Sequence, residues 1–217
     1  MGGSTKQALL QALSAAEGTY ISGQQLAEAL GVSRAAVHKA AQALSAQGYA
    51  LDSAPRRGYR LAGGDPFCAE AVGPYPAPIH IYDTLQSSNL TAKQLALGGA
   101  PHGTLVLTAH QQAGRGRLGR AWQNAPGEAL YYTVVFKRPF AQPACLPLAV
   151  SLETAAALRV EFGAACAVKW PNDLLLGGKK LVGILCEGVP GGIVCGIGVN
   201  LRQSRQYFEA AGLPHAA

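Results

Sequence analysis

The sequence predicts a two-part α/β (α+β) protein, in which a small helical domain precedes a larger domain built on a mixed sheet. Residues 1–62 are rich in Ala, Leu and Gln and repeat apolar positions at helical spacing, whereas short β-branched runs between glycine turns begin at Ile79. Glycine and proline breakers separate these two patterns. We therefore expect one domain over residues 1–63, a linker over 64–78 and a second domain over 79–217.

Three helices and a hairpin are expected in the first domain. The first helix carries an apolar stripe of leucines. Ser22 and Gln25 have the spacing of a capping box that opens a second helix, and Ser33 caps a third helix directly after a tight turn. Extended pieces follow at 49–52 and 58–61. This order of elements is typical of a winged helix-turn-helix.

The third helix and the tip of the hairpin carry polar and basic side chains that suit DNA binding. Such side chains reach phosphates or base edges when a helix enters the major groove and the wing touches the flanking backbone. The candidate DNA-binding residues are Arg34, His38, Lys39 and Gln42 on the third helix, with Arg56 and Arg57 on the wing. A winged helix that serves only as a docking module is the alternative.

The composition limits the classes of function. Of the 217 residues, 49% are hydrophobic and 14% are charged, against roughly 25% charged in an average soluble domain. No apolar run approaches the ~20 residues of a membrane span, and the N-terminus lacks a secretory signal. We therefore expect a cytoplasmic protein with no membrane partner. The net charge of +6 permits a polyanionic partner, and five scattered cysteines argue against disulfides and a zinc site.

A loop rich in glycine and arginine follows a predicted strand at 104–109. The glycines of residues 114–119 formally match a dinucleotide-binding fingerprint, but that fingerprint must open a helix, and residues 123–127 (QNAPG) disfavour one. Three arginines lie in the same loop: Arg115, Arg117 and Arg120. Arginines among glycines instead predict a flexible cationic cover for a phosphate-bearing ligand. A solvated basic loop is the alternative.

A second candidate constellation is the segment 169–173 (KWPND), which follows a short predicted strand. A lysine at the end of a strand supplies a point charge for a carboxylate or phosphate, and Asp173 is a candidate carboxylate near the site. Alone, Lys169 can equally be a surface lysine. A hairpin is expected over 174–182, and two further strands are expected within 183–199.

Together these segments resemble the successive signatures of the biotin protein ligases, in the family's order and at similar separations. The matching segments are 111–117 (QQAGRGR), 169–173 (KWPND), 183–187 (GILCE) and 196–200 (GIGVN), with 87–89 (SSN) similar to the family's Ser-Thr-Asn motif. The first domain resembles that of the bifunctional members, which also repress biotin synthesis genes. The resemblance implies a mixed-sheet, class II synthetase-like catalytic domain.

The resemblance also implies a two-step reaction that depends on ATP. The carboxylate of biotin attacks the α-phosphate of ATP and forms biotinyl-5′-AMP, and a lysine of a biotin carboxyl carrier protein then takes the biotin. Mg²⁺ is expected to accompany ATP, with its protein ligands unassigned. Operator DNA is the second implied partner, and a homodimer on adenylate binding is a further expectation.

The resemblance assigns roles residue by residue. Lys169 is expected to hold the biotin carboxylate, and Arg115 and Arg117 are expected to grip the phosphate; these three are the implied catalytic residues. The implied biotin-binding residues are Ser87, Ser88, Asn89, Gln111, Arg115, Gly116, Arg117 and Lys169. The implied ATP- and adenylate-binding residues are Arg115, Arg117, Arg120, Trp122, Asn172, Asp173 and Asn200.

Two features depart from the family pattern. Leu118 stands where family members often carry another arginine. The sequence ends at residue 217, whereas the family continues with further helices and commonly an SH3-like barrel, so we expect that barrel to be absent and the catalytic domain to be incomplete. The alternative functions are a non-catalytic biotin-sensing regulator, a lipoate-type acyl ligase, and a transcription regulator with another effector.

Overall fold

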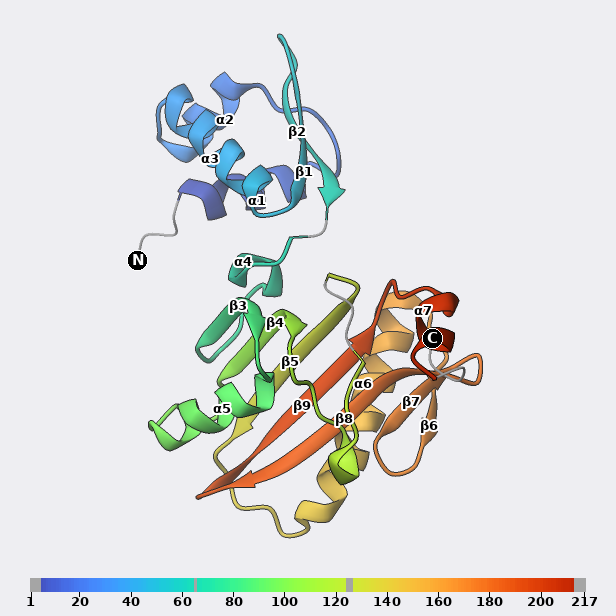
Figure 1. The fold of residues 1–217 in the computed structure, drawn as a ribbon. Coiled ribbons are helices and arrows are strands. Elements are labelled where there is room, and N and C mark those ends of the chain that lie inside the picture. The colour runs from blue at the N-terminus through green and yellow to red at the C-terminus, as the bar shows by residue number, and fades with distance from the viewer. Residues whose placement is uncertain (1–4, 65, 124–126, 213–217) are drawn as a thin grey trace. The chain divides into compact units, whose positions relative to one another are not determined.

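The computed structural model describes residues 5–64, 66–123 and 127–212 (Figure 1). Residue contacts divide the chain into two compact units, Met1–Pro74 and Tyr75–Ala217. Each unit has a hydrophobic core of its own. Part of the segment that was expected to disfavour a helix, residues 124–126, lies outside the described residues, as do the last residues, 213–217.

The first unit has the predicted order of three helices and a two-stranded hairpin. Its elements are α1 (Thr5–Ala15), α2 (Gly23–Leu30), α3 (Arg34–Ala46), β1 (Tyr49–Ala54), β2 (Gly58–Gly64) and α4 (Ala69–Val72). The capping box of α2 is confirmed, because the Ser22 hydroxyl accepts from the Gln25 backbone N–H and the Gln25 side chain accepts from the Ser22 N–H, both at 3.1 Å. Ser33 caps α3 in the same way. The short helix α4 lies within the stretch that was expected to be a linker.

A few leucines and one valine hold the three helices together. The fully buried members of this core include Leu9, Leu13, Leu26, Val37 and Leu44. Burial of each large aliphatic side chain contributes about 1.5–3 kcal/mol. The polar face of α3 therefore remains on the surface, because its apolar positions are used for packing.

The second unit is an α/β structure in which a seven-stranded sheet has the order β3-β4-β5-β9-β8-β7-β6 within the described residues. Its elements are β3 (Ile79–Leu85), α5 (Ser88–Leu97), β4 (Leu105–Gln111), η1 (Arg117–Gly119), β5 (Ala129–Phe136), η2 (Pro143–Cys145), α6 (Leu146–Phe162), β6 (Ala167–Lys169), β7 (Asp173–Leu176), β8 (Lys179–Val189), β9 (Gly192–Asn200) and α7 (Arg205–Ala210). Only β3 and β4 are parallel, so the predicted mixed sheet is confirmed.

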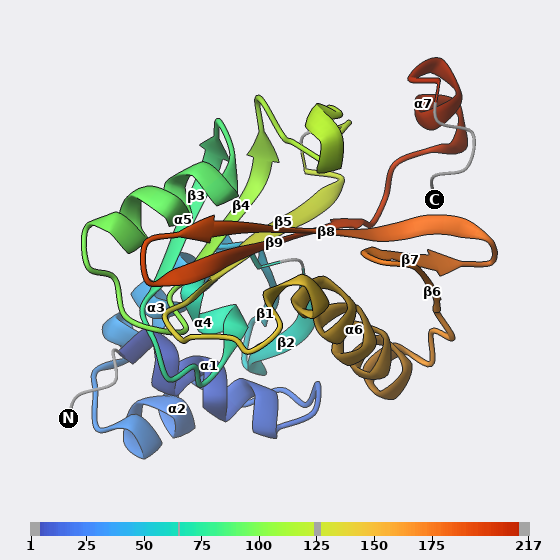
Figure 2. The ribbon, with the colours of Figure 1, turned by 90° about the horizontal axis from the view of Figure 1, so that it is seen from below.

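Helices α5 and α6 lie on opposite faces of this sheet (Figure 2). Helix α5 contacts β4, β5, β8 and β9, whereas α6 contacts β6, β7 and β8. Successive residues of a strand point to opposite faces. Along β8, Glu187 therefore bonds to α5, while Ile184 and Cys186 pack in the core cluster on the α6 side.

Two features of the second unit differ from the sequence expectations. The hairpin over 174–182 is confirmed by the pairing of β7 with β8, but β8 continues without a break to Val189 instead of forming a separate strand. One described stretch, Pro143–Phe162, is long and apolar enough to cross a membrane by length and composition, with a mean hydropathy of 1.2. Its most apolar window is 11% buried, and α6 contacts three strands of the sheet.

The five cysteines are free thiols. Cys68 and Cys195 are buried, Cys166 and Cys186 are half-buried, and Cys145 is exposed.

Candidate functional site

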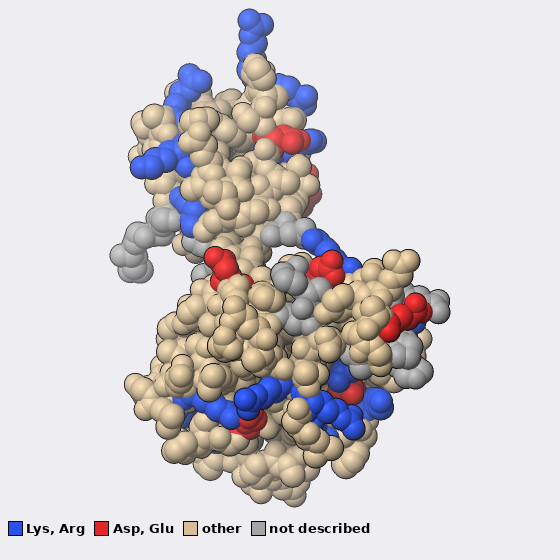
Figure 3. All heavy atoms as spheres, viewed as in Figure 1, with Lys and Arg blue, Asp and Glu red and all other residues tan. Residues whose placement is uncertain are grey.

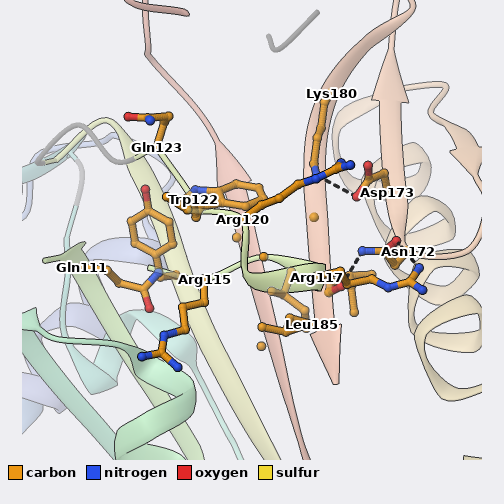
Figure 4. A pocket seen from close by; sticks show the side chains of 18 of the residues that line it. Gln111, Arg115, Arg117, Arg120, Trp122, Gln123, Asn172, Asp173, Lys180 and Leu185 are labelled. Atoms are coloured by element: carbon orange, nitrogen blue, oxygen red, sulfur yellow. Dashed lines mark hydrogen bonds and ion pairs between the residues drawn. The ribbon is translucent and has the colours of Figure 1, made fainter. Parts of the chain in front are cut away.

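A cavity of about 570 Å³ opens on the α5 side of the sheet, within the second unit (Figure 4). Its walls come from the start of α5, the end of β4, the loop after β4, the turn between β6 and β7, and strands β8 and β9. All thirteen candidate biotin- and ATP-binding residues line it: Ser87, Ser88, Asn89, Gln111, Arg115, Gly116, Arg117, Arg120, Trp122, Lys169, Asn172, Asp173 and Asn200. The segments that carry them lie far apart in the sequence and meet here.

The loop that covers the cavity closes on itself by backbone hydrogen bonds. The N–H of Gly116 donates to the carbonyl of Arg120 at 2.7 Å, and the N–H of Trp122 donates to the carbonyl of Gly114 at 2.9 Å. Between them lies the single 3₁₀ turn η1, in which Leu118 has a φ of 58° and is 88% exposed. Within its described part, the loop therefore opens no α-helix, in agreement with the rejection of a dinucleotide-binding fingerprint.

One arginine of the loop is tied to the turn after β6. Arg117 donates from Nη1 to Asn172 Oδ1 at 3.1 Å, and Asn172 donates from Nδ2 to the carbonyl of Ile184 on β8 at 2.8 Å. Figure 4 shows Arg117 directed toward Asn172, while Arg115 points away from it. Arg117 thus links the loop to the turn after β6 by a side-chain hydrogen bond, which can be exchanged for a bond to an anionic ligand.

Lys180, which the sequence reasoning did not select, is a cation of the cavity wall. Its Nζ lies 2.8 Å from Asp173 Oδ1 and 5.0 Å from the centre of the Trp122 ring. Lys169 also lines the cavity, but it is exposed and has no ion pair among the described residues. The predicted hairpin over 174–182 contained Lys180 but not Asp173, and the pairing of the two side chains becomes visible only in the structure, where β7 begins at Asp173.

The ring of Trp122 packs against bare backbone on two neighbouring strands. A Cβ on Gly183 of β8 would overlap the Trp122 ring, and a Cβ on Gly198 of β9 would lie 3.0 Å from it. These glycines therefore create the seat for the indole. Tyr131, which also lines the cavity, is buried, and this burial raises the pKa of Tyr131 to about 12.

The opposite wall is formed by the start of α5 and the end of β4. The Ser88 backbone N–H donates to Gln111 Oε1 at 2.7 Å, and the Ser88 hydroxyl lies 3.1 Å from the same oxygen. Ser87 occupies the N-cap position of α5 but makes no side-chain cap bond. This wall is therefore polar and neutral, whereas the other walls of the cavity carry apolar and cationic side chains.

The charges of the cavity favour an anion. Its described lining contains five cations, namely Arg115, Arg117, Arg120, Lys169 and Lys180, against one carboxylate, that of Asp173. No group of three or more His, Cys, Asp or Glu side chains with the spacing of a metal site occurs among the described residues.

The candidate DNA-binding residues lie on the surface of the first unit. Arg34, His38, Lys39 and Gln42 are exposed along α3. Lys and Arg side chains are visible on this unit in Figure 3. His38 Nδ1 lies 3.0 Å from the hydroxyl of Tyr59 on β2, which joins the helix to the wing.

The wing carries its arginines in two different settings. Arg57 lies 4.2 Å from the centre of the Tyr20 ring, and Arg56 has a φ of 62° at the turn. Arg60, which the sequence reasoning did not select, is ion-paired with Asp52 across the hairpin. The charge of Arg60 is therefore already offset, whereas Arg56 has no ion pair among the described residues.

Comparison with known proteins gives two matching families. The biotin/lipoate A/B protein ligase family matches residues 82–204, and a helix-turn-helix (HTH) domain matches residues 5–60. The bifunctional ligase/repressor BirA of Bacillus subtilis is 32% identical over 222 residues, which span 96% of this chain and 68% of that protein. The BirA of Escherichia coli is 33% identical over 203 residues, which span 88% of this chain and 62% of that protein.

Comparison with solved structures gives a related result. The biotin protein ligase from Aquifex aeolicus, in complex with biotin and ATP, aligns with a TM-score of 0.55 and 26% identity. The alignment covers 64% of this chain and 58% of that protein. This chain therefore spans between about three-fifths and two-thirds of the length of these relatives.

Proposed function

The chain belongs to the biotin/lipoate A/B protein ligase family, and from this premise we propose that it is an ATP-dependent biotin protein ligase that also represses transcription. In the first step, an oxygen of the biotin carboxylate attacks the α-phosphorus of ATP, the bond to the β-phosphate breaks, and pyrophosphate leaves. In the second step, the amine of a carrier-protein lysine attacks the acyl carbon, AMP leaves, and an amide forms. The proteins that supply this lysine are biotin carboxyl carrier proteins.

One observation carries this proposal: a single cavity joins a neutral polar wall to five cations. The ureido end of biotin is neutral and polar, whereas its carboxylate and the phosphates of ATP are anionic. Their mutual repulsion must be offset before the carboxylate can attack. A site with the two kinds of wall facing each other meets both requirements.

The cations divide between two tasks in this proposal. Arg115, Arg117 and Arg120 bind the phosphates from the loop, and loop closure excludes water that would hydrolyse the adenylate. Lys180 is held by Asp173 inside the cavity, which supports it as the contact of the biotin carboxylate. Lys169, to which the sequence reasoning gave that role, is exposed and would act at the entrance.

The remaining candidates hold the neutral parts of the ligands. Ser87, Ser88, Gln111 and the backbone of Gly116 contact the biotin ureido ring and chain. Trp122 covers the adenine from its seat on the two glycines. Asn200, whose Nδ2 donates to the carbonyl of Lys180 at 3.0 Å, supports that side of the site.

The described residues fit a magnesium ion that arrives with ATP. Mg²⁺ is usually held by phosphate oxygens, waters and one or two carboxylates, and the lining offers the carboxylate of Asp173 with the amide oxygen of Asn172. When bound, the ion neutralises phosphate charge. Lys180 already pairs with Asp173, so this carboxylate is oriented before ATP binds.

The first unit gives the protein its second activity in this proposal. Helix α3 enters the major groove of an operator, with Arg34, His38, Lys39 and Gln42 toward the DNA, and Arg56 and Arg57 contact phosphates beside it. In the sheet formed by the described residues, β3 is an edge strand, and its outer backbone groups would pair with a second copy in a homodimer on adenylate binding. We place the protein in the cytoplasm, where its substrates and DNA occur together.

The test of the ligase proposal uses the whole chain with biotin, Mg²⁺-ATP and a biotin carboxyl carrier domain. Mass spectrometry should detect biotinyl-5′-AMP bound to the chain and a biotin-sized mass increase on the carrier. Adenylate without transfer would indicate a biotin-sensing regulator. Absence of biotin binding by calorimetry would contradict the proposal, and tighter binding of lipoate would assign the chain to the lipoate branch.

A further inference from the structure

The side chain of Asn89 lines the cavity, but its hydrogen-bonding groups are used inside the protein. Its Nδ2 donates to the carbonyl of Leu185 at 3.1 Å and to Glu187 Oε2 at 2.7 Å. Both partners are acceptors, so the atom that faces them must be the amide nitrogen. The Asn89 Oδ1 is thereby directed away from β8 and toward Thr133, whose hydroxyl lies 2.8 Å from it.

The orientation of the Asn89 amide determines the direction of the hydrogen bond between Thr133 and Asn89. A threonine hydroxyl has one hydrogen, and Thr133 must give it to Asn89 Oδ1, because an amide oxygen can only accept. Thr133 is fully buried, and its Oγ1 is also 2.8 Å from the hydroxyl of Ser88. The Thr133 hydroxyl can therefore only accept a hydrogen bond from Ser88.

Ser88 is the end of this relay at the cavity. Its single hydroxyl hydrogen goes to Thr133 at 2.8 Å or to Gln111 at 3.1 Å, and both partners lie within the protein. Toward the cavity, the Ser88 hydroxyl can therefore only accept a hydrogen bond. The group of a ligand that faces it must be a donor.

The relay begins at the carboxylate of Glu187. Its Oε1 lies 2.5 Å from the ammonium of Lys93, and only 31% of its side chain is exposed. An ionised carboxylate accepts and never donates, so it sets the orientation of the Asn89 amide. Gly196 of β9 makes this geometry possible, because a Cβ there would overlap Asn89 Oδ1.

We propose that Glu187 is a positioning residue that, through Asn89 and Thr133, makes the Ser88 hydroxyl an acceptor for a ureido N–H of biotin. The proposal rests on the proposed function and assigns Asn89 a supporting role in place of direct contact with biotin. It also gives a chemical reason why the site would bind biotin in preference to lipoate or octanoate. Biotin carries two N–H donors in its ring, whereas lipoate and octanoate carry none that could meet Ser88.

The test measures the dissociation constant of biotin by calorimetry with the whole chain. In Glu187→Gln, the new amide can donate to Asn89 Oδ1. This gives up the bond from Asn89 Nδ2 to the carbonyl of Leu185, but it lets the relay reverse, so that the Ser88 hydroxyl can turn its hydrogen toward the ligand. We expect biotin binding to weaken at least about tenfold, because a donor then faces a donor. The KM for ATP should stay within about twofold, because the change is confined to the biotin wall.

The matched control is Lys93→Met, which removes the ion pair but leaves the carboxylate and its bond to Asn89. Its biotin affinity should stay within about threefold of the parent chain, as expected for loss of a partly exposed ion pair. Equal losses in Glu187→Gln and Lys93→Met would overturn the proposal, because the ion pair would then be the active feature. An unchanged affinity in Glu187→Gln would overturn it as well.

A second pair of variants covers the case in which Glu187→Gln does not fold. Thr133→Val keeps the shape of the side chain but removes the nearer of the two acceptors of the Ser88 hydrogen, so that only the longer contact to Gln111 holds this hydrogen away from the ligand, whereas Thr133→Ser keeps the hydroxyl. We expect Thr133→Val to lose biotin affinity and Thr133→Ser to retain it; equal affinities would overturn the proposal. If the parent chain itself does not bind biotin, the proposed function fails. If the parent chain binds biotin but the variants bind it equally well, only the positioning role of Glu187 fails.

Discussion

The ammonium of Lys180 lies 2.8 Å from the carboxylate of Asp173, on the other arm of the same hairpin. A lysine held in this way keeps its charge inside the cavity before a ligand arrives. We expect Lys180→Ala to lower the rate of adenylate formation by on the order of 100-fold, because an electrostatic contact to the reacting groups is lost. The exchange of labelled pyrophosphate into ATP, with biotin present, measures this step.

The control for this prediction is Lys169→Ala. Since Lys169 is exposed, its loss should cost much less than the loss of Lys180. The reverse order of the two rates would return the carboxylate contact to Lys169, as the sequence resemblance assigned it. Thermal unfolding of both variants should be close to that of the parent chain.

The contact between Arg117 and Asn172 leads to a prediction about retention of the intermediate. Arg117→Gly removes the only described side-chain hydrogen bond from η1 to the turn after β6. The loop should open more readily, so that free biotinyl-5′-AMP in the filtrate increases at least about tenfold. Rapid filtration followed by mass spectrometry gives the ratio of free to bound adenylate. Arg138→Ala, outside the cavity lining, should release no more than the parent.

The seat of Trp122 can be tested with a pair of glycine variants on the same strand. Gly183→Ala places a methyl group where the indole lies, whereas the same change at Gly188 meets no atom within 4 Å. We expect Gly183→Ala to raise the KM for ATP by about tenfold, because the ring that covers the adenine must move. Gly188→Ala should leave it unchanged. Equal KM values for the two variants would remove Trp122 from the adenine site.

DNA binding by the first unit predicts a specific salt dependence. Arg34→Ala should weaken binding to a DNA fragment selected by the parent chain from a random pool. The slope of log K against log salt should fall by about one phosphate contact. Biotin affinity should not change, since Arg34 belongs to the other compact unit. An unaltered slope would indicate that α3 does not contact the backbone of DNA.

The carboxyl group of Glu187 predicts how stability depends on pH. Burial alone would raise the pKa of Glu187, but hydrogen bonds from Lys93 and Asn89 and the charge of Arg115 lower it below its ordinary value of 4.5. A lowered pKa in the folded state means that the ionised form stabilises the fold above pH 4.5, and that this contribution is lost as the pH falls through the lower value. Urea unfolding of the parent and Glu187→Gln should therefore differ most near neutral pH and converge in acid.

Local signals in the sequence predicted the first unit well. Serine caps and an apolar stripe act within a few residues, so Ser22 and Ser33 mark the starts of two helices without knowledge of the rest of the fold. Helix α6 was not predicted, because its apolar residues occur around much of its surface and give no clear helical repeat.

The residues of the site were predicted better than their roles. Motif segments identified thirteen lining residues, but which lysine enters the cavity depends on how β7 pairs with β8. The register shifts between Leu174 and Leu175, and this irregularity redirects the side chains beyond it. Periodicity cannot foresee such a shift, so Lys180 was missed. The direction of the Asn89 amide likewise depends on Glu187, 98 positions away.

The glycine seat beneath Trp122 has a practical consequence. The chain contains two tryptophans, and the other one, Trp170, is 77% exposed. Replacing Trp170 with phenylalanine would leave one indole, set in the lining of the cavity beside the ammonium of Lys180. Its emission spectrum would then respond to each ligand that enters or leaves, so that occupancy of the site could be followed in real time without any label.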